Sequence, residues 1–143
     1  MKKMFVLLIM SIFLVMSCSK KAIKPVSLES QTAQSVIETI NMLKTAYVHK
    51  DEAALTRYTT DFGFSSNFKA AAMDFSSAEL SFTPMWVDIK SDTLQVQVSW
   101  TGKWVYHGHN IEENGVAGFV VTGPPYRVDK ILRDNPFAVL TVK

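Results

Sequence analysis

Apolar residues recur at helical spacing along residues 32–49, with polar residues between them. This pattern predicts an amphipathic helix that buries one face. Asp51 is a suitable N-cap for a second, short helix over 52–60. We expect a third helical piece around 68–75, capped by Ser65 or Ser66, with Gly63 breaking the chain before it. The apolar face of the first helix comprises Val36, Ile40, Leu43 and Tyr47.

From Ser77 onward the period changes to two, which is typical of strands. The first strand, 77–89, changes phase at Pro84, and this favours a β-bulge. The second strand begins at Leu94, alternates regularly and runs on to Trp104 or Val105. We expect a polar loop over 106–114. Further strands are predicted over 115–122 and 126–132, with a short tail strand over 137–142.

Helices followed by a run of antiparallel strands predict an α+β domain, with the helices packed on one face of a bent sheet. No internal repeat and no low-complexity tract interrupts this order. The strand at 115–122 is apolar on both faces, which suits a central strand covered on both sides.

The N-terminal residues have the pattern of a targeting sequence. Lys2 and Lys3 precede an apolar run over 4–16, which is too short for an ordinary transmembrane helix and typical of a secretory signal. Val15-Met16-Ser17-Cys18 resembles the bacterial lipobox, which implies cleavage before Cys18 and lipidation of its sulfur and new amino group. We therefore expect a signal peptide at 1–17, a lipidated tether at 18–31 and a folded domain at 32–143.

Charge and cysteine content change meaning once the chain is divided at Cys18. The whole chain has a net charge of +2, whereas removal of Lys2 and Lys3 leaves 13 basic and 13 acidic residues. Such a balance does not indicate a nucleic-acid partner. The single cysteine excludes an intrachain disulfide. No dinucleotide, phosphate-loop or HExxH motif indicates a cofactor.

The tether contains Lys20, Lys21 and Lys24. These lysines either belong to a solvent-exposed flexible tether or are attracted to the headgroups of anionic lipids. Ser19 stands where Gram-negative bacteria use Asp to retain lipoproteins in the inner membrane. The resemblance therefore implies an outer-membrane location, at its periplasmic face or at the cell surface, if the source is Gram-negative.

Several segments of the mature chain resemble the nuclear transport factor 2-like (cystatin-like cone) superfamily. The resemblance rests on the helix end Ala46-Tyr47-Val48-His49-Lys50-Asp51, on the short helix Ala53–Tyr58 and on the closing pattern Tyr126–Phe137. It covers about residues 32–137. It implies a curved sheet wrapped around the long helix, with an open cone and, in many members, dimerisation through the sheet.

Ketosteroid isomerases of this superfamily use a phenol or acid and a carboxylate base inside the cone. The resemblance places the phenol at Leu43, the base near Ser66 and the second acid at Ala117. None of these residues can play those roles, and Asp61 is the nearest carboxylate to the base position. Isomerase chemistry is therefore disfavoured, although another reaction in the cone stays open.

Other residues are candidates for a binding site. His107 and His109 would point the same way on an extended strand and reach one metal, with a third ligand from Glu112, Glu113 or Asp88, but an exposed polar loop is the commoner explanation. Aromatic residues could line the cone, although such stripes are more often core. Pocket-lining candidates are Tyr47, Trp86, Trp100 and Trp104, and polar candidates are Arg57, Asp61, Asp88 and Tyr106.

Two functional classes follow. The leading expectation is a lipid-anchored module of the bacterial envelope that binds a small apolar ligand, a second copy of itself or another envelope protein. The alternative is a cone-fold enzyme of isomerase, dehydratase or hydrolase type with an unrecognised catalytic set. The content of the cone distinguishes them: converging ionisable groups favour an enzyme, a dry pocket favours ligand binding, and a filled cone favours assembly.

Overall fold

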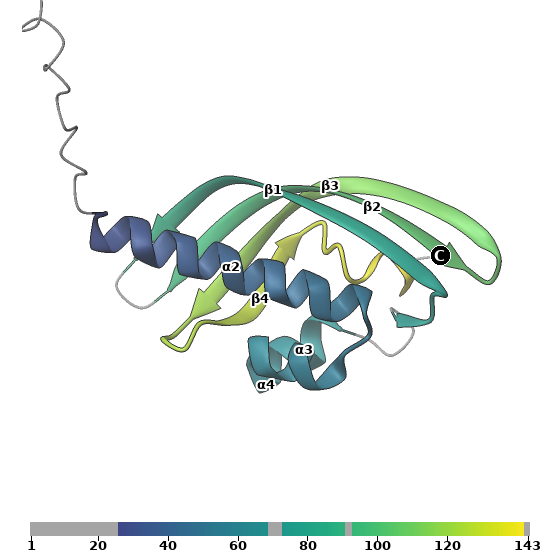
Figure 1. The fold of residues 1–143 in the computed structure, drawn as a ribbon, viewed down its shortest axis with the longest axis horizontal. Helices are drawn as coiled ribbons and strands as arrows, with labels where there is room; N and C mark the ends of the chain where they lie inside the picture. The colour runs from purple at the N-terminus through teal and green to yellow at the C-terminus, as the bar shows by residue number, and fades with distance from the viewer. Residues whose placement is uncertain (1–25, 69–72, 91–92, 142–143) are drawn as a thin grey trace, which may run out of the picture.

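The structure is a computed structural model that describes residues 26–68, 73–90 and 93–141. The predicted signal peptide, Cys18 and most of the tether lie outside these residues. In the described part, helices precede a four-stranded antiparallel sheet of order β1-β2-β3-β4. The sheet curves over the helices, which lie on its concave side (Figure 1). The α+β class and the bent sheet are confirmed.

The long helix α2 spans Leu28–Val48. It begins earlier than predicted, because Ser27 is its N-cap and accepts a hydrogen bond from the Ser30 amide at 3.2 Å. Residues 28–31, which we expected to belong to the tether, therefore form the first turn of the helix. The predicted apolar face is buried as expected.

The second helix, α3 (Glu52–Tyr58), is capped by Asp51, whose carboxylate accepts from the Ala54 amide at 2.9 Å. Residues 69–72 of the third helix predicted at 68–75 lie outside the described part, and Phe68, Asp74 and Phe75 are not helical; Ser65 and Ser66 are not caps, because they lie inside an earlier helix. Instead α4 spans Asp61–Asn67 and is capped by Thr60. Gly63 does not break the chain: it lies inside α4, where a Cβ atom would stand 2.2 Å from the Val128 carbonyl oxygen.

The strands are β1 (Ser77–Ile89), β2 (Leu94–Tyr106), β3 (His109–Thr122) and β4 (Arg127–Arg133). The bulge predicted at Pro84 is confirmed, since the β1–β2 register shifts between Pro84 and Trp86. The strand predicted at 115–122 is the second half of β3. It is interior to the sheet, but Val116 and Val120 on its outer side are only partly buried.

The polar loop predicted at 106–114 is wrong. Tyr106 pairs directly with His109, so β2 and β3 form a tight hairpin. The two turn residues, His107 and Gly108, both have positive φ values, 48° and 80°, as two-residue hairpin turns of the primed type require. Polar residues in this stretch extend the strands beyond the core instead of forming a loop.

The tail strand predicted at 137–142 is also wrong. After β4 the chain turns at Arg133, whose φ is 67°, and residues 139–141 form a short 3-10 helix, η3 (Val139–Thr141). The segment folds back beneath the sheet (Figure 1). Phe137 is fully buried there. Among the described residues, no helix has the length and apolar character that a membrane crossing requires.

Candidate functional site

The concave side of the sheet is the place where the cone fold offers a site, and here aromatic side chains fill it. The Phe137 ring lies 4.8 Å from the rings of both Tyr47 and Phe68, measured between centroids. Phe82 and Phe119 approach Phe137 from the sheet at 6.1 and 6.3 Å. A gap between α2 and the sheet next to Phe82 is too narrow to hold a water molecule. The cone is therefore closed to a small molecule along this path.

Tyr47 and Trp104 form the polar contact inside this cluster. The Trp104 indole Nε1 donates a hydrogen bond to the Tyr47 hydroxyl at 3.2 Å. Burial raises the pKa of Tyr47 above its ordinary value of 10.0, and the hydrogen bond from Trp104 partly opposes that rise. The phenol therefore keeps its proton at neutral pH, and its hydroxyl is engaged with Trp104 inside the core.

Phe137 is placed by a relay of two amides. Asn67, buried at the end of α4, donates from Nδ2 to the Gly63 carbonyl at 2.7 Å and accepts from the Ile131 amide at 3.1 Å. The backbone carbonyl of Asn67 accepts a hydrogen bond from Asn135 Nδ2 at 3.1 Å. The side-chain Oδ1 of Asn135 in turn accepts one from the Phe137 backbone amide at 2.9 Å. These bonds connect α4, β4 and the C-terminal segment. They hold in place the cluster of aromatic rings around Phe137, here called the plug, which comprises Tyr47, Phe68, Phe82, Phe119 and Phe137.

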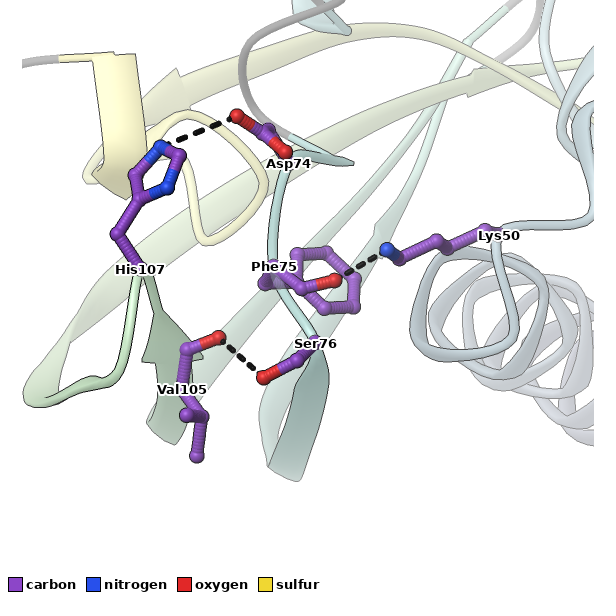
Figure 2. Close-up of polar contacts among 6 residues, drawn as sticks. All are labelled: Lys50, Asp74, Phe75, Ser76, Val105 and His107. Carbon is purple, nitrogen blue, oxygen red and sulfur yellow. Dashed lines mark hydrogen bonds and ion pairs between the residues drawn. The ribbon is translucent and has the colours of Figure 1, made fainter.

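The other side of the cone is covered by residues 73–76, here called the strap, which lead into β1. Figure 2 shows its ties: Lys50 Nζ donates to the Phe75 carbonyl, and the Ser76 hydroxyl donates to the Val105 carbonyl at 3.1 Å. The Phe75 ring packs 5.2 Å from the Tyr47 ring. The strap is thus bonded both to the end of α2 and to β2.

The histidine pair does not lie on one extended strand. His107 is in the hairpin turn and His109 is the first residue of β3. His107 Nε2 lies 3.3 Å from Asp74 Oδ2, a contact between the hairpin and the strap (Figure 2). Among the described residues no group of three or more His, Cys, Asp or Glu is arranged for a metal ion.

The three positions that the isomerase resemblance assigned to catalytic groups, Leu43, Ser66 and Ala117, carry no carboxyl or phenol group. Leu43 and Ala117 are fully buried apolar residues. Ser66 lies on the exposed side of α4, and Asp61 is exposed at its first turn.

The other polar candidates do not converge. Arg57 is exposed on α3. Asp88 pairs with Lys90 at 3.1 Å near the end of β1, whereas Tyr106 ends β2 at the opposite end of the sheet. Sequence reasoning missed Asn67, Asn135 and Phe137. Its available signal was the Asn-Pro-Phe run directly after the last strand.

The tryptophans divide between two faces. Trp100 and Trp104 are buried on the concave side, where they belong to the core together with Tyr47, as aromatic stripes of this kind more often do. The Trp100 indole donates to the Asp134 carbonyl at 2.8 Å. The Trp100 side chain also borders a surface hollow of about 430 Å³. The other residues that line this hollow are Glu113, Asn114, Arg133, Asp134, Asn135, Ala138 and Val139.

Trp86 lies on the convex face, where it begins a row that crosses all four strands. The row runs Trp86–Gln97–Gly118–Leu132 in the strand register. Trp86 and Leu132 are exposed, and between them Gly118 contributes to a shallow hollow of about 230 Å³. Farther along, the face is polar: Lys103 and Glu112 pair at 3.0 Å, and this hydrogen bond holds the pKa of Lys103 above its usual range.

Known structures share this architecture. A nuclear transport factor 2-like superfamily protein from Salmonella enterica serovar Typhimurium LT2 superposes with a TM-score of 0.66 at 16% identity, covering 76% of this chain and 93% of that one. A protein from Shewanella frigidimarina NCIMB 400, described as a "putative ketosteroid isomerase", superposes with a TM-score of 0.54 at 12% identity, covering 68% and 92%. No protein-family model and no curated protein sequence matches the chain.

The domain therefore has the nuclear transport factor 2-like cone fold. This is a class of architecture and not yet an activity, because the same fold hosts unrelated functions. In this chain the concave side of the sheet is filled by aromatic side chains centred on Phe137.

Proposed function

We propose that the chain is a lipid-anchored module of the bacterial envelope that acts by protein–protein contact and not by catalysis. The observation that carries the proposal is the filled cone, with Phe137 at its centre. A cone-fold enzyme needs an acid, a base and space for a substrate, whereas here the corresponding interior positions are Leu43 and Ala117. The anchoring part of the proposal rests on the sequence around Cys18.

The contact surface in this proposal is the convex face around the Trp86–Leu132 row, and its partner is a second copy of the chain. A two-fold contact presents the same patch on both sides, so it needs protrusions beside a matching hollow. Trp86 and Leu132 provide the protrusions, and Gly118 provides the hollow. Tryptophan is also enriched among the residues that contribute most to binding at protein interfaces.

Photo-cross-linking in intact cells tests the contact. A photoreactive phenylalanine analogue at position 86 of the full-length chain is expected to give a covalent dimer. The same analogue at Thr101, exposed at the polar end of that face, is the matched control and is expected to give little dimer. Equal dimer from both positions, or dimer from Thr101 alone, contradicts the assignment of the surface.

Metabolic labelling with a palmitate analogue tests the anchor separately. The wild-type chain is expected to incorporate the label, and Cys18→Ala is expected to lose it. Ser17→Ala, which keeps a small residue before the cleavage point, is expected to retain it. Equal labelling of wild type and Cys18→Ala would sink the lipoprotein assignment.

A further inference from the structure

The direction of α2 determines which end of the domain is nearest to the tether. Near its C-terminus Tyr47 packs on Phe75, just before β1, and one turn earlier Lys44 Nζ lies 5.5 Å from the Phe82 ring centre. The helix therefore runs antiparallel to β1. Its first residue, Leu28, lies at the end where β1 finishes (Figure 1).

The turn between β3 and β4 lies at the same end. Leu94 at the start of β2 pairs with Val121, and Thr122 pairs with Arg127. The N-terminus of α2, the end of β1 and the β3–β4 turn all lie at the left-hand end of the molecule in Figure 1. We call this region the basal end and define it by Val26, Leu28, Ile89, Lys90 and Arg127.

The basal end exposes apolar side chains that the helix does not need for packing. Leu28 is 78% exposed and Val26 is 59% exposed, and Ile89 is also exposed. Val26 and Leu28 flank the Ser27 cap, at the point where the chain leaves the tether. The first amides of a helix have no carbonyl partners within the helix, so their hydrogen exchange is sensitive to whether this end is covered.

The length of the tether places this end close to Cys18. Cys18 precedes the N-cap Ser27 by nine residues, which span about 30 Å when fully extended. The 21 residues of α2 are of similar length, about 32 Å. A bilayer that held Cys18 would therefore meet the basal end before it met the His107 hairpin at the opposite end.

Charge favours the same orientation. Lys20, Lys21 and Lys24 lie in the tether, and Arg127 is exposed at the basal end. Among the described residues of this end Glu29 balances Arg127 and Asp88 pairs with Lys90, and the sequence adds Asp92 between β1 and β2, so the excess positive charge comes from the three tether lysines. Basic segments beside a membrane are attracted to anionic lipids.

We propose that the basal end docks onto an anionic phospholipid bilayer, with Val26 and Leu28 at the headgroup level. This inference rests on the proposed lipidation of Cys18 and goes beyond it, because a lipid anchor alone does not orient a domain. Docking leaves the convex face and the His107 hairpin free of the membrane.

Amide hydrogen exchange measured by mass spectrometry tests the docking. The mature chain from Cys18, which contains every described residue, is coupled through its single thiol to maleimide-bearing lipid in vesicles with phosphatidylglycerol. Residues 26–31 are expected to exchange several-fold more slowly on these vesicles than in the uncoupled protein. Residues 105–110 at the hairpin are expected to exchange equally in both states.

Variants identify the groups responsible. The double variant Val26→Glu, Leu28→Glu is expected to lose the protection, whereas Met42→Glu, at a 53% exposed position farther along α2, is expected to keep it. Replacing Lys20, Lys21 and Lys24 by Gln is expected to reduce the protection of residues 26–31. Vesicles made of phosphatidylcholine alone are also expected to reduce this protection. Exchange at 26–31 that is unchanged by coupling, or equal protection at the hairpin, would overturn the proposal.

The two proposals can fail independently. Chemical coupling supplies the anchor whether or not cells acylate Cys18, so the exchange experiment reports docking alone. If the wild-type chain took up no palmitate label in cells, Cys18 would not be acylated and the proposed native anchor would be wrong. That outcome would leave a positive exchange result as evidence for a membrane-binding end that is held by other means.

Discussion

The Trp104 indole donates a hydrogen bond to the Tyr47 hydroxyl at 3.2 Å, and both residues are almost completely buried. This bond joins the last residues of β2 to the last turn of α2. It satisfies a polar N–H inside an otherwise aromatic cluster, where an unpaired donor would be costly.

Tyr47→Phe removes the acceptor and leaves the Trp104 N–H without that partner. The free energy of unfolding is expected to fall by about 1–3 kcal/mol. Tyr58→Phe, at a partly buried tyrosine of α3, is the matched control and is expected to change it by less than about 0.5 kcal/mol. Chemical denaturation measures both. Equal effects would show that the Tyr47–Trp104 bond is of little consequence.

The raised pKa of Tyr47 makes stability depend on alkaline pH. The folded chain holds the phenolic proton more tightly than the unfolded chain, whose tyrosine titrates near 10.0. This contribution is therefore complete below about pH 10 and is lost as the pH rises above it. Denaturation at about pH 9 and about pH 11 is expected to show a smaller stability difference between wild type and Tyr47→Phe at the higher pH.

Phe137→Ala is expected to open the cone. Removing a fully buried phenylalanine costs about 3–5 kcal/mol and leaves an apolar cavity. Phe62→Ala, at a phenylalanine that is 54% exposed, is the control and is expected to cost far less. Denaturation measures the loss, and binding of a small apolar probe reports the cavity. A Phe137 variant as stable as the Phe62 variant would contradict the role of the plug.

Gly63→Ala is expected to push α4 away from β4. The added methyl group would stand 2.2 Å from the Val128 carbonyl oxygen, which belongs to the backbone and cannot turn aside. We expect a loss of about 1–3 kcal/mol. Gly118→Ala is the comparison, since the nearest atom there is the flexible Gln95 amide nitrogen at 3.3 Å. Thermal unfolding that ranks the two variants in the reverse order would disprove the packing argument.

Local patterns predicted the parts of the fold that local forces determine. The apolar face of α2, the Asp51 cap and the regular alternation of β2 each appear within a few residues, so each could be read from the sequence. The bulge at Pro84 was also visible, because a change of phase beside a proline needs no distant contact.

The missed parts depend on distant partners. Gly63 looks like a helix breaker until the Val128 carbonyl, 65 positions later, is seen to require it. Phe137 has the alternation of a strand residue, yet the Asn67–Asn135 relay turns it into the cone. For the same reason the sequence indicated Tyr47, Trp100 and Trp104 on the concave side, but it added Trp86, which is exposed, and gave no sign of Phe137 at the centre.

Asn67 has a consequence for any attempt to build an enzyme from this chain. It lies beside Ser66, where the isomerase resemblance places the catalytic base. Exchanging its amide for a carboxylate would remove the donor to Gly63 and confine a negative charge near that carbonyl. The same substitution would also loosen the connection that seats Phe137. Reactivity and closure thus compete for one side chain, and an engineered catalyst on this scaffold would have to be redesigned from the C-terminal segment inward.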